Sequence, residues 1–378
     1  MAVESIFHVL YPMHMLGFLS ILFAATLALN QVAVADEVDV KIGVCLALTG
    51  SLAEYGEAVR NGIELARLQH PEYFKNVEFI YEDDAYDPKK AVLNFRKFTT
   101  IDKINFMFAW GAEPSLTLAP IAEREKFAII TQSPLVSISR NRSDILRFQY
   151  NDDKHGLVLT EYLKNQGIKR IGMIMSEGSF FQLLSNGIEK HLKDDQSYTV
   201  ITSVLPSETD FRSILIRKDL KNYDITGVYL FPGQLRIFYR QMHELGLNFR
   251  TFGTTTFEST SILQDVLPLI EGVPYTHSAT SDEFLKEYVR YYGNNMHAGY
   301  AAGCYDFAML AGKLATSGKI TAAMNGLGII DAFKQVKPFS GASGNIKLIQ
   351  SKEDGTYFDF DIAVKKFVAG KIVTEFKM

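Results

Sequence analysis

The stretch ALTGSLAEYGEAVRNGIELA, residues 47–66, runs from the end of an apolar segment through a short polar loop into a helical pattern. Small and apolar residues recur in it at the spacing that gives a helix one apolar stripe, which is expected to cover a sheet. These residues are Ala58, Val59, Gly62, Ile63 and Ala66. A strand, a loop and a helix in this order are typical of an α/β protein.

The same alternation continues over most of the chain. The apolar runs of strand length lie at 40–48, 77–82, 104–110, 127–131, 170–175, 198–204, 227–231 and 250–254. Helical patterns separate them, and one of these helices is expected to begin with Asp87 as its cap and Pro88 in its first turn. Strands that are apolar throughout and alternate with helices indicate parallel sheets covered on both faces.

The alternation breaks at two places, which suggests two domains. The first break lies near 147–156, and the second follows 272–282, after which the chain becomes mainly helical. The chain ends in strand-like runs, two of which the sequence KEDG, residues 352–355, is expected to join as a hairpin. A chain of 378 residues with 47% hydrophobic content is long enough for two cores.

Residues 1–35 have the pattern of a secretory signal peptide. An apolar run at 15–29 is short for a membrane span, and Ala33 and Ala35 provide small residues before a cleavage point after about Ala35. The usual positive start is missing, because Lys41 is the first basic residue. The alternative is an uncleaved anchor that recruits residues 6–16 into a longer span.

The composition argues against several functions. Loss of Glu4 with the leader leaves 39 basic and 42 acidic residues, a net charge of −3, which disfavours nucleic acid or an anionic membrane as a partner. Cys45 and Cys304 lie in apolar segments and are expected to be buried free thiols. No phosphate loop, zinc-protease motif or nucleophile elbow occurs, and the eight His residues show no metal-ligand spacing. We therefore expect no enzyme, no cofactor and no metal.

Two loops at the carboxyl ends of predicted strands are candidates for a binding site. In open α/β sheets, ligands bind beyond these ends, beside the N-termini of helices. The first loop offers Thr49, Gly50, Ser51 and Tyr55, with helix capping by Thr49 or Ser51 as the alternative. The second offers Trp110, Gly111 and Glu113. Trp110 is either a stacking surface or a core residue, and Glu113 is expected to cap its helix.

Six segments, taken in order, resemble the bacterial periplasmic solute-binding proteins of the branched-chain amino acid type, which serve ABC transporters. They are VKIGVCLALTGSLAEYGEAVRNGIELA, IYEDDAYDPKKAV, FAIITQSP, RIGMIMSEGSFF, GYAAGCYDFAMLAGKLA and FSGASGNIKL, and together they span the chain beyond the leader. The resemblance implies a type I periplasmic binding fold, with two Rossmann-like lobes joined by three hinge crossings. The implied lobes are 36–150 with 281–338, and 151–280 with 339–378. The crossings would lie near 148–152, 277–282 and 337–341.

The resemblance also implies a ligand site between the lobes, but this chain departs from the family pattern there. Ala112 and Leu135 stand where relatives place a Ser and a Thr for the ligand carboxylate, and Ser133 remains at a main-chain contact. The implied positions in the second lobe are Phe180 and Phe181 in place of a Tyr-Gly pair, Gly233 in place of a Tyr, and Thr255, with Glu258 as a substitute for the acid that pairs with the ligand ammonium.

These departures change the expected ligand. A buried carboxylate or ammonium without charged hydrogen-bond partners is costly, so ordinary α-amino acids should bind poorly. Aromatic rings are expected to line the cleft instead, from Tyr55, Trp110, Phe180, Phe181 and Phe257. The expected ligand is therefore apolar or aromatic, with at most one carboxylate or amide group.

The resemblance implies a monomeric periplasmic receptor that delivers a small organic molecule to an ABC permease in the inner membrane. The alternative is a two-lobe sensor that acts on a signalling partner.

Overall fold

The computed structural model describes residues 40–151 and 153–378. The predicted signal peptide, residues 1–35, lies outside the described residues. Within the described part of the chain, none of the helices combines the length and the apolar character needed to cross a membrane.

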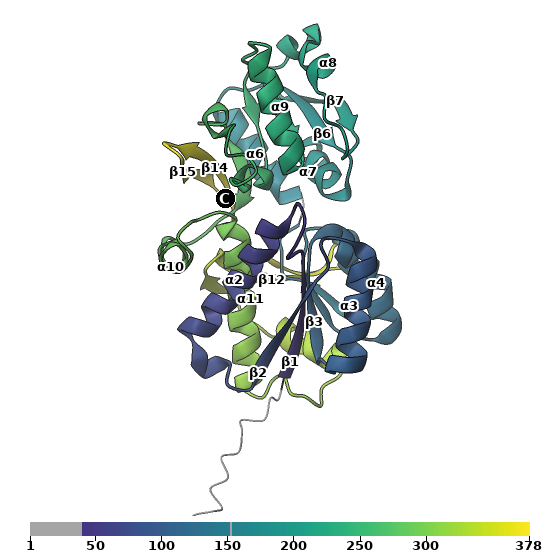
Figure 1. Cartoon of the computed structure of the whole chain (residues 1–378). Coiled ribbons are helices and arrows are strands. Elements are labelled where there is room, and N and C mark those ends of the chain that lie inside the picture. The colour runs from purple at the N-terminus through teal and green to yellow at the C-terminus, as the bar shows by residue number, and fades with distance from the viewer. Residues whose placement is uncertain (1–39, 152) are drawn as a thin grey trace, which may run out of the picture. The chain divides into compact units, whose positions relative to one another are not determined.

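The first sheet has eight strands and is parallel over its central part (Figure 1). In spatial order the strands are β11 (Phe339–Gly341), β12 (Gly344–Ser351), β13 (Gly355–Asp359), β5 (Ile145–Arg147), β4 (Ile129–Gln132), β3 (Phe106–Trp110), β1 (Val40–Leu46) and β2 (Val77–Asp83). Every residue of β3 and β4 is buried. Helices cover both faces, as continuous apolar strands predict.

One face of this sheet carries α2 and α11, and the other carries α3 and α4 (Figure 1). The helices of this part are α2 (Ala53–Gln69), α3 (Pro88–Lys97), α4 (Ala112–Glu125), α5 (Val136–Ser139), α10 (Asp282–Tyr292), α11 (Ala298–Thr316) and α12 (Gly326–Lys334), with the single turns Pro71–Tyr73 and Phe98–Asp102. The predicted start of α3 is confirmed, because the side chain of Asp87 accepts a hydrogen bond from the backbone N–H of Lys89 at 2.7 Å.

The second group of strands forms two sheets. Four parallel strands follow the order β7 (Ser197–Val204), β6 (Arg170–Ser176), β8 (Ile225–Tyr229) and β9 (Thr251–Phe252). Three antiparallel strands follow the order β10 (Tyr275–Ser278), β14 (Ile362–Val368) and β15 (Lys371–Lys377). A bridge between Gly253 and Tyr275 links the two sheets. The helices are α6 (Asp153–Asn165), α7 (Ser179–Lys190), α8 (Arg212–Leu215) and α9 (Pro232–Glu244), with the short turns η3 (Lys218–Asn222), η4 (Thr255–Glu258) and η5 (Leu267–Leu269).

The chain passes between the two groups of strands three times, and the passages are fastened to one another. They follow β5, β10 and β13. The backbone N–H of Ala279 donates to the carbonyl of Asp361 at 2.9 Å, and the hydroxyl groups of Tyr150 and Ser278 are 3.1 Å apart. The rings of Tyr150 and Phe360 meet edge to face at 5.1 Å.

The structure corrects the prediction for residues 339–378. Their first part was expected in the second lobe, but β11, β12 and β13 extend the first sheet, where Tyr357 of β13 pairs with Arg147 of β5. The pairing covers backbone groups that β5 would otherwise leave exposed as an edge strand. The third passage therefore lies at Phe360 and Asp361 instead of 337–341. The predicted hairpin is confirmed, since β12 and β13 pair antiparallel on either side of residues 352–354.

The α/β fold class is confirmed by these sheets and helices. Cys45 and Cys304 are both buried and free, as predicted. The remaining lobe boundaries stay predictions.

Candidate functional site

A pocket forms where the carboxyl ends of strands from both groups meet the beginnings of helices. It encloses about 670 Å³ of space, including its opening to solvent. Seventeen residues line it: Leu52, Tyr55, Tyr86, Trp110, Gly111, Ala112, Glu113, Gln132, Pro134, Gly178, Ser179, Phe180, Phe181, Phe231, Thr255, Thr256 and Tyr300. This position agrees with the rule that ligands of open α/β sheets bind beyond the strand ends.

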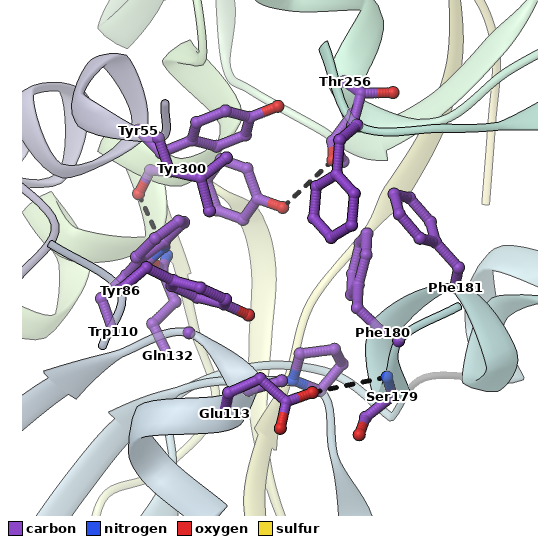
Figure 2. A pocket seen from close by; sticks show the side chains of 17 residues that line it. Tyr55, Tyr86, Trp110, Glu113, Gln132, Ser179, Phe180, Phe181, Thr256 and Tyr300 are labelled. Atoms are coloured by element: carbon purple, nitrogen blue, oxygen red, sulfur yellow. Dashed lines mark hydrogen bonds between the residues drawn. The ribbon is translucent and has the colours of Figure 1, made fainter. Parts of the chain in front are cut away.

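Aromatic rings form two opposite walls of the pocket. Figure 2 shows Tyr55, Tyr86, Trp110 and Tyr300 on one side and Phe180 and Phe181 on the other. The Trp110 ring lies 5.6 Å from that of Tyr55, 5.7 Å from that of Tyr86 and 6.1 Å from that of Tyr300. Such distances are typical of favourable ring pairs, so these side chains support one another as a rigid surface.

On the opposite wall, the first turn of α7 supplies two consecutive rings. Phe180 is partly exposed, whereas Phe181 is 1% exposed and meets Phe231 edge to face at 5.0 Å. The rings of Phe180 and Phe181 are 5.6 Å apart. Phe181 therefore belongs both to the pocket and to the core beneath it.

Most polar groups in the walls are already paired within the protein. The Gln132 amide donates to the backbone carbonyl of Tyr300 at 3.1 Å and accepts from the Cys304 thiol at 3.2 Å. The Tyr300 hydroxyl donates to Thr255 Oγ1 at 3.3 Å. The Thr256 hydroxyl oxygen is buried and has no hydrogen-bond partner among the described residues.

Glu113 supplies the only charged side chain among the lining residues that the structure describes. Its Oε1 accepts a hydrogen bond from the backbone N–H of Ser179, at the start of α7, at 3.4 Å (Figure 2). A helix N-terminus attracts anions, and at the start of α7 the carboxylate of Glu113 occupies the position that an anionic ligand would take.

The ring of Tyr86 lies beside the start of α4, where a Cβ atom placed on Gly111 would lie 2.5 Å from its Cε2. Burial, followed by the charge of Glu113, raises the pKa of Tyr86 to about 12, while the backbone N–H groups of Glu113 and Ala112 act in the opposite direction. The Tyr86 hydroxyl thus stays protonated and lies against the start of α4. The starts of α4 and α7 at this pocket are thus both covered by side chains of the protein.

Seven of the predicted site residues line the pocket. They are Tyr55, Trp110, Gly111, Ala112, Phe180, Phe181 and Thr255. Trp110 is 5% exposed and lines the pocket, so it is a core residue at the pocket wall, and its role as a stacking surface stays a prediction.

Four predicted site residues lie elsewhere. Ser51 is exposed and does not line the pocket, and Ser133 is fully buried beneath it, with its Oγ accepting from the N–H of Leu135 at 3.4 Å. Gly233 lies in α9, where Phe231 reaches the pocket instead. Glu258 is fully buried and accepts hydrogen bonds from Tyr275 and Lys365.

Three smaller predictions are wrong. Thr49 does not cap α2, because its hydroxyl donates to Asp83 at 2.6 Å, and no side chain caps that helix. Glu113 does not cap α4, because its carboxylate bonds α7. Phe257 stacks on Tyr275 at 5.7 Å in the core and does not line the pocket.

Apart from Glu113, which belongs to the second candidate loop, the remaining lining residues were not predicted. Gln132 and Phe231 each stand at the carboxyl end of a predicted strand, which was a usable signal. Tyr86 and Tyr300 carried no such signal, because Tyr86 follows β2 after a turn and Tyr300 lies in a long apolar helix. Only the packing of α11 on the first sheet brings Tyr300 to the pocket.

Comparison with known proteins supports a specific family. The family described as "Periplasmic binding protein" matches residues 39–364. The Leu/Ile/Val-binding protein homolog 2 of Brucella abortus (strain 2308) is 23% identical over 350 residues, which cover 87% of this chain and 90% of that protein.

Solved structures resemble this one in fold. A leucine-binding protein from Thermotoga maritima superposes with a TM-score of 0.78 at 21% identity, covering 90% of this chain and 98% of that chain. A solute-binding protein of an R. palustris ABC transporter, in complex with benzoate, gives 0.75 at 17% identity, covering 89% and 96%. The fold is that of type I periplasmic binding proteins. Because the family match spans most of its length, the chain belongs to the periplasmic binding protein family.

Proposed function

We propose that this chain is a receptor that holds one small aromatic molecule without a negative charge in the pocket and delivers it to an ABC permease. The observation that carries the proposal is the lining itself: rings on both walls, one carboxylate, and no basic side chain among the described lining residues. An aromatic ligand would bury its faces against the rings of Trp110 and Phe180.

The names of a relative and of a solved structure point to two kinds of ligand. The Brucella abortus relative is named for Leu/Ile/Val, and the R. palustris structure holds benzoate. An α-amino acid needs partners for a carboxylate and an ammonium group, and benzoate needs partners for a carboxylate. Ala112 lines the pocket here without a side-chain donor, and Leu135 does not line it.

A carboxylate would meet two unfavourable features in this pocket. Glu113 supplies a like charge, and the starts of α4 and α7 are covered by Tyr86 and Glu113. Burying a carboxylate without compensating partners costs on the order of several kcal/mol. An amide of the same size carries no charge and avoids most of that cost.

Three molecules of one size and different charge test the proposal: benzamide, benzylamine and benzoate. Their dissociation constants are measured by calorimetry and by the emission of Trp110, the only Trp of the chain. We expect benzamide to bind tightest and benzoate about tenfold or more weaker, a difference of about 1.4 kcal/mol or more. Leucine is included, and tightest binding by benzoate or leucine would overturn the proposal.

The role of Glu113 is tested with a matched pair of variants. Glu113→Gln removes the charge at the pocket and should strengthen benzoate binding by about tenfold relative to benzamide. Glu189→Gln makes the same chemical change at an exposed position of α7 and should leave the ratio unchanged. Equal effects of the two substitutions would assign no role to Glu113.

Delivery to a permease is tested in the organism that encodes the chain. Deletion of the gene should abolish uptake of the radiolabelled ligand that binds tightest. Unchanged uptake, together with an altered transcriptional response to that ligand, would favour the sensor.

A further inference from the structure

Glu258, His277 and His297 form a buried cluster behind the pocket. They belong to η4, to β10 and to the residue that precedes α11. Each residue is 0% exposed, and each offers one ligand atom within 4.8 Å of the other two. Nε2 of His277 lies 3.7 Å from Oε2 of Glu258. No short sequence motif predicts this cluster, because His277 follows Glu258 by 19 positions and His297 follows His277 by 20.

Several polar atoms of the cluster have no hydrogen-bond partner. They are Oε2 of Glu258, both ring nitrogens of His277 and Nδ1 of His297. Buried polar groups are nearly always paired, because an unpaired one costs about 1–3 kcal/mol. Four such atoms within one small cluster therefore indicate a partner that the protein chain does not supply.

The groups that surround the cluster leave one carboxylate oxygen of Glu258 and one ring nitrogen of His277 free to bind a metal ion. Lys365 at 3.4 Å and Tyr275 at 3.2 Å both bond Oε1 of Glu258, so Oε2 remains available. A Cβ atom placed on Gly299 would lie 2.3 Å from Nδ1 of His277, so helix α11 closes that side of the ring. Nε2, on the other side, faces Glu258.

The charged groups around the cluster have opposite effects on a cation. Lys365 would repel a cation, but Glu54 brings a second carboxylate, with Oε2 3.9 Å from Nε2 of His297.

A second pocket lies beside one member of the cluster. It encloses about 500 Å³, including its opening, and His297 is part of its lining. Glu54 and Glu57 are its charged residues, and no Lys or Arg is among the described residues that line it. An acidic entrance of this kind concentrates cations and repels anions.

We propose that Glu258, His277 and His297 bind one divalent transition-metal ion, with Zn²⁺ as the favoured ion. Two imidazoles and one carboxylate are a ligand set that zinc accepts, with water in the fourth position. His297 precedes a helix of the first sheet, whereas the other two ligands belong to the second group of strands. The bound ion ties these segments together directly behind Tyr55, whose ring stacks on His297 at 3.9 Å.

The test uses the full chain without a histidine tag, stripped with a chelator and titrated with Zn²⁺ alone. We expect one ion per chain by calorimetry and elemental analysis. Co²⁺ in its place should give the visible absorption of a four-coordinate site. Absence of stoichiometric binding in the wild type would overturn the proposal, whatever the pocket binds, because no organic ligand is present.

Substitutions locate the ion. His277→Gln, His297→Gln and Glu258→Gln should each weaken Zn²⁺ binding about tenfold or more. His155→Gln is the matched control, because His155 is also buried but has hydrogen bonds at both ring nitrogens, to Tyr150 at 2.9 Å and Thr276 at 2.7 Å. Circular dichroism checks that each variant is folded. Zinc affinity unchanged in all folded cluster variants would place the ion elsewhere and refute the assignment.

Discussion

Phe180 and Phe181 are neighbours in sequence, yet their replacement should have different consequences. Both line the pocket, but Phe180 is partly exposed and Phe181 is 1% exposed. We expect Phe180→Ala to weaken ligand binding with a small effect on stability, and Phe181→Ala to destabilise the fold strongly. The difference follows from what each ring contacts in the absence of ligand.

The magnitudes can be worked from burial. A ligand that covers the pocket side of the Phe180 ring would bury roughly 60–80 Å² of it, worth about 1.5–2 kcal/mol at 25 cal/mol per Å². Its loss corresponds to a dissociation constant about 10–30 times larger. Truncation of a fully buried Phe costs about 3–5 kcal/mol of unfolding free energy, which applies to Phe181 and its contacts with Phe231.

Two measurements separate these effects. Emission of Trp110 during titration with benzamide gives the dissociation constant, and urea denaturation gives the free energy of unfolding. Phe376→Ala serves as control, because Phe376 is a partly buried Phe on β15 that does not line the pocket. The reasoning is refuted if Phe180→Ala changes benzamide affinity less than twofold, or if it destabilises the protein as much as Phe181→Ala.

Two further predictions concern the backbone and the pH. Gly111 has φ +92°, and an added Cβ would lie 2.5 Å from Cε2 of Tyr86, so Gly111→Ala should cost about 1–2 kcal/mol of stability and weaken benzamide binding. Gly233→Ala in α9 meets no atom within 4 Å and should be neutral or stabilising in the same urea denaturation experiment. Burial raises the pKa of Asp306 to about 6, so the folded state binds this proton more tightly than the unfolded chain does. The contribution of Asp306 to stability should therefore fall by up to about 3 kcal/mol as the pH rises from about 4 to 6; a wild-type advantage over Asp306→Asn that stays constant from pH 4 to 7 would contradict this.

Much of the fold could be predicted because it depends on local patterns. Apolar runs of strand length separated by amphipathic helices identify a parallel sheet, and Asp87 with Pro88 marks a helix start. The assignment of residues 339–359 failed for a physical reason. Two strands far apart in sequence, such as those of Tyr357 and Arg147, pair through backbone hydrogen bonds. Such bonds do not depend on the side chains, so no local sequence pattern predicts the pairing.

Lining residues at the ends of strands could be predicted from the sequence. Lining residues that reach the pocket only through the packing of distant helices could not. Trp110 ends a strand and Gly111 follows it directly, whereas Tyr300 lies on a helix that begins more than a hundred residues later. The rings at 180 and 181 both reach the pocket because they begin a helix that starts at its edge. The cluster of Glu258, His277 and His297 was hidden for the same reason as Tyr300.

The three passages between the strand groups have a mechanical consequence. They are joined side to side by the Ala279–Asp361 and Tyr150–Ser278 hydrogen bonds and by the ring contact of Tyr150 with Phe360. A change in the backbone of one passage is thereby transmitted to the passages beside it, so the three are expected to bend together. A protease cut in one passage would leave two fragments that the other two passages still connect.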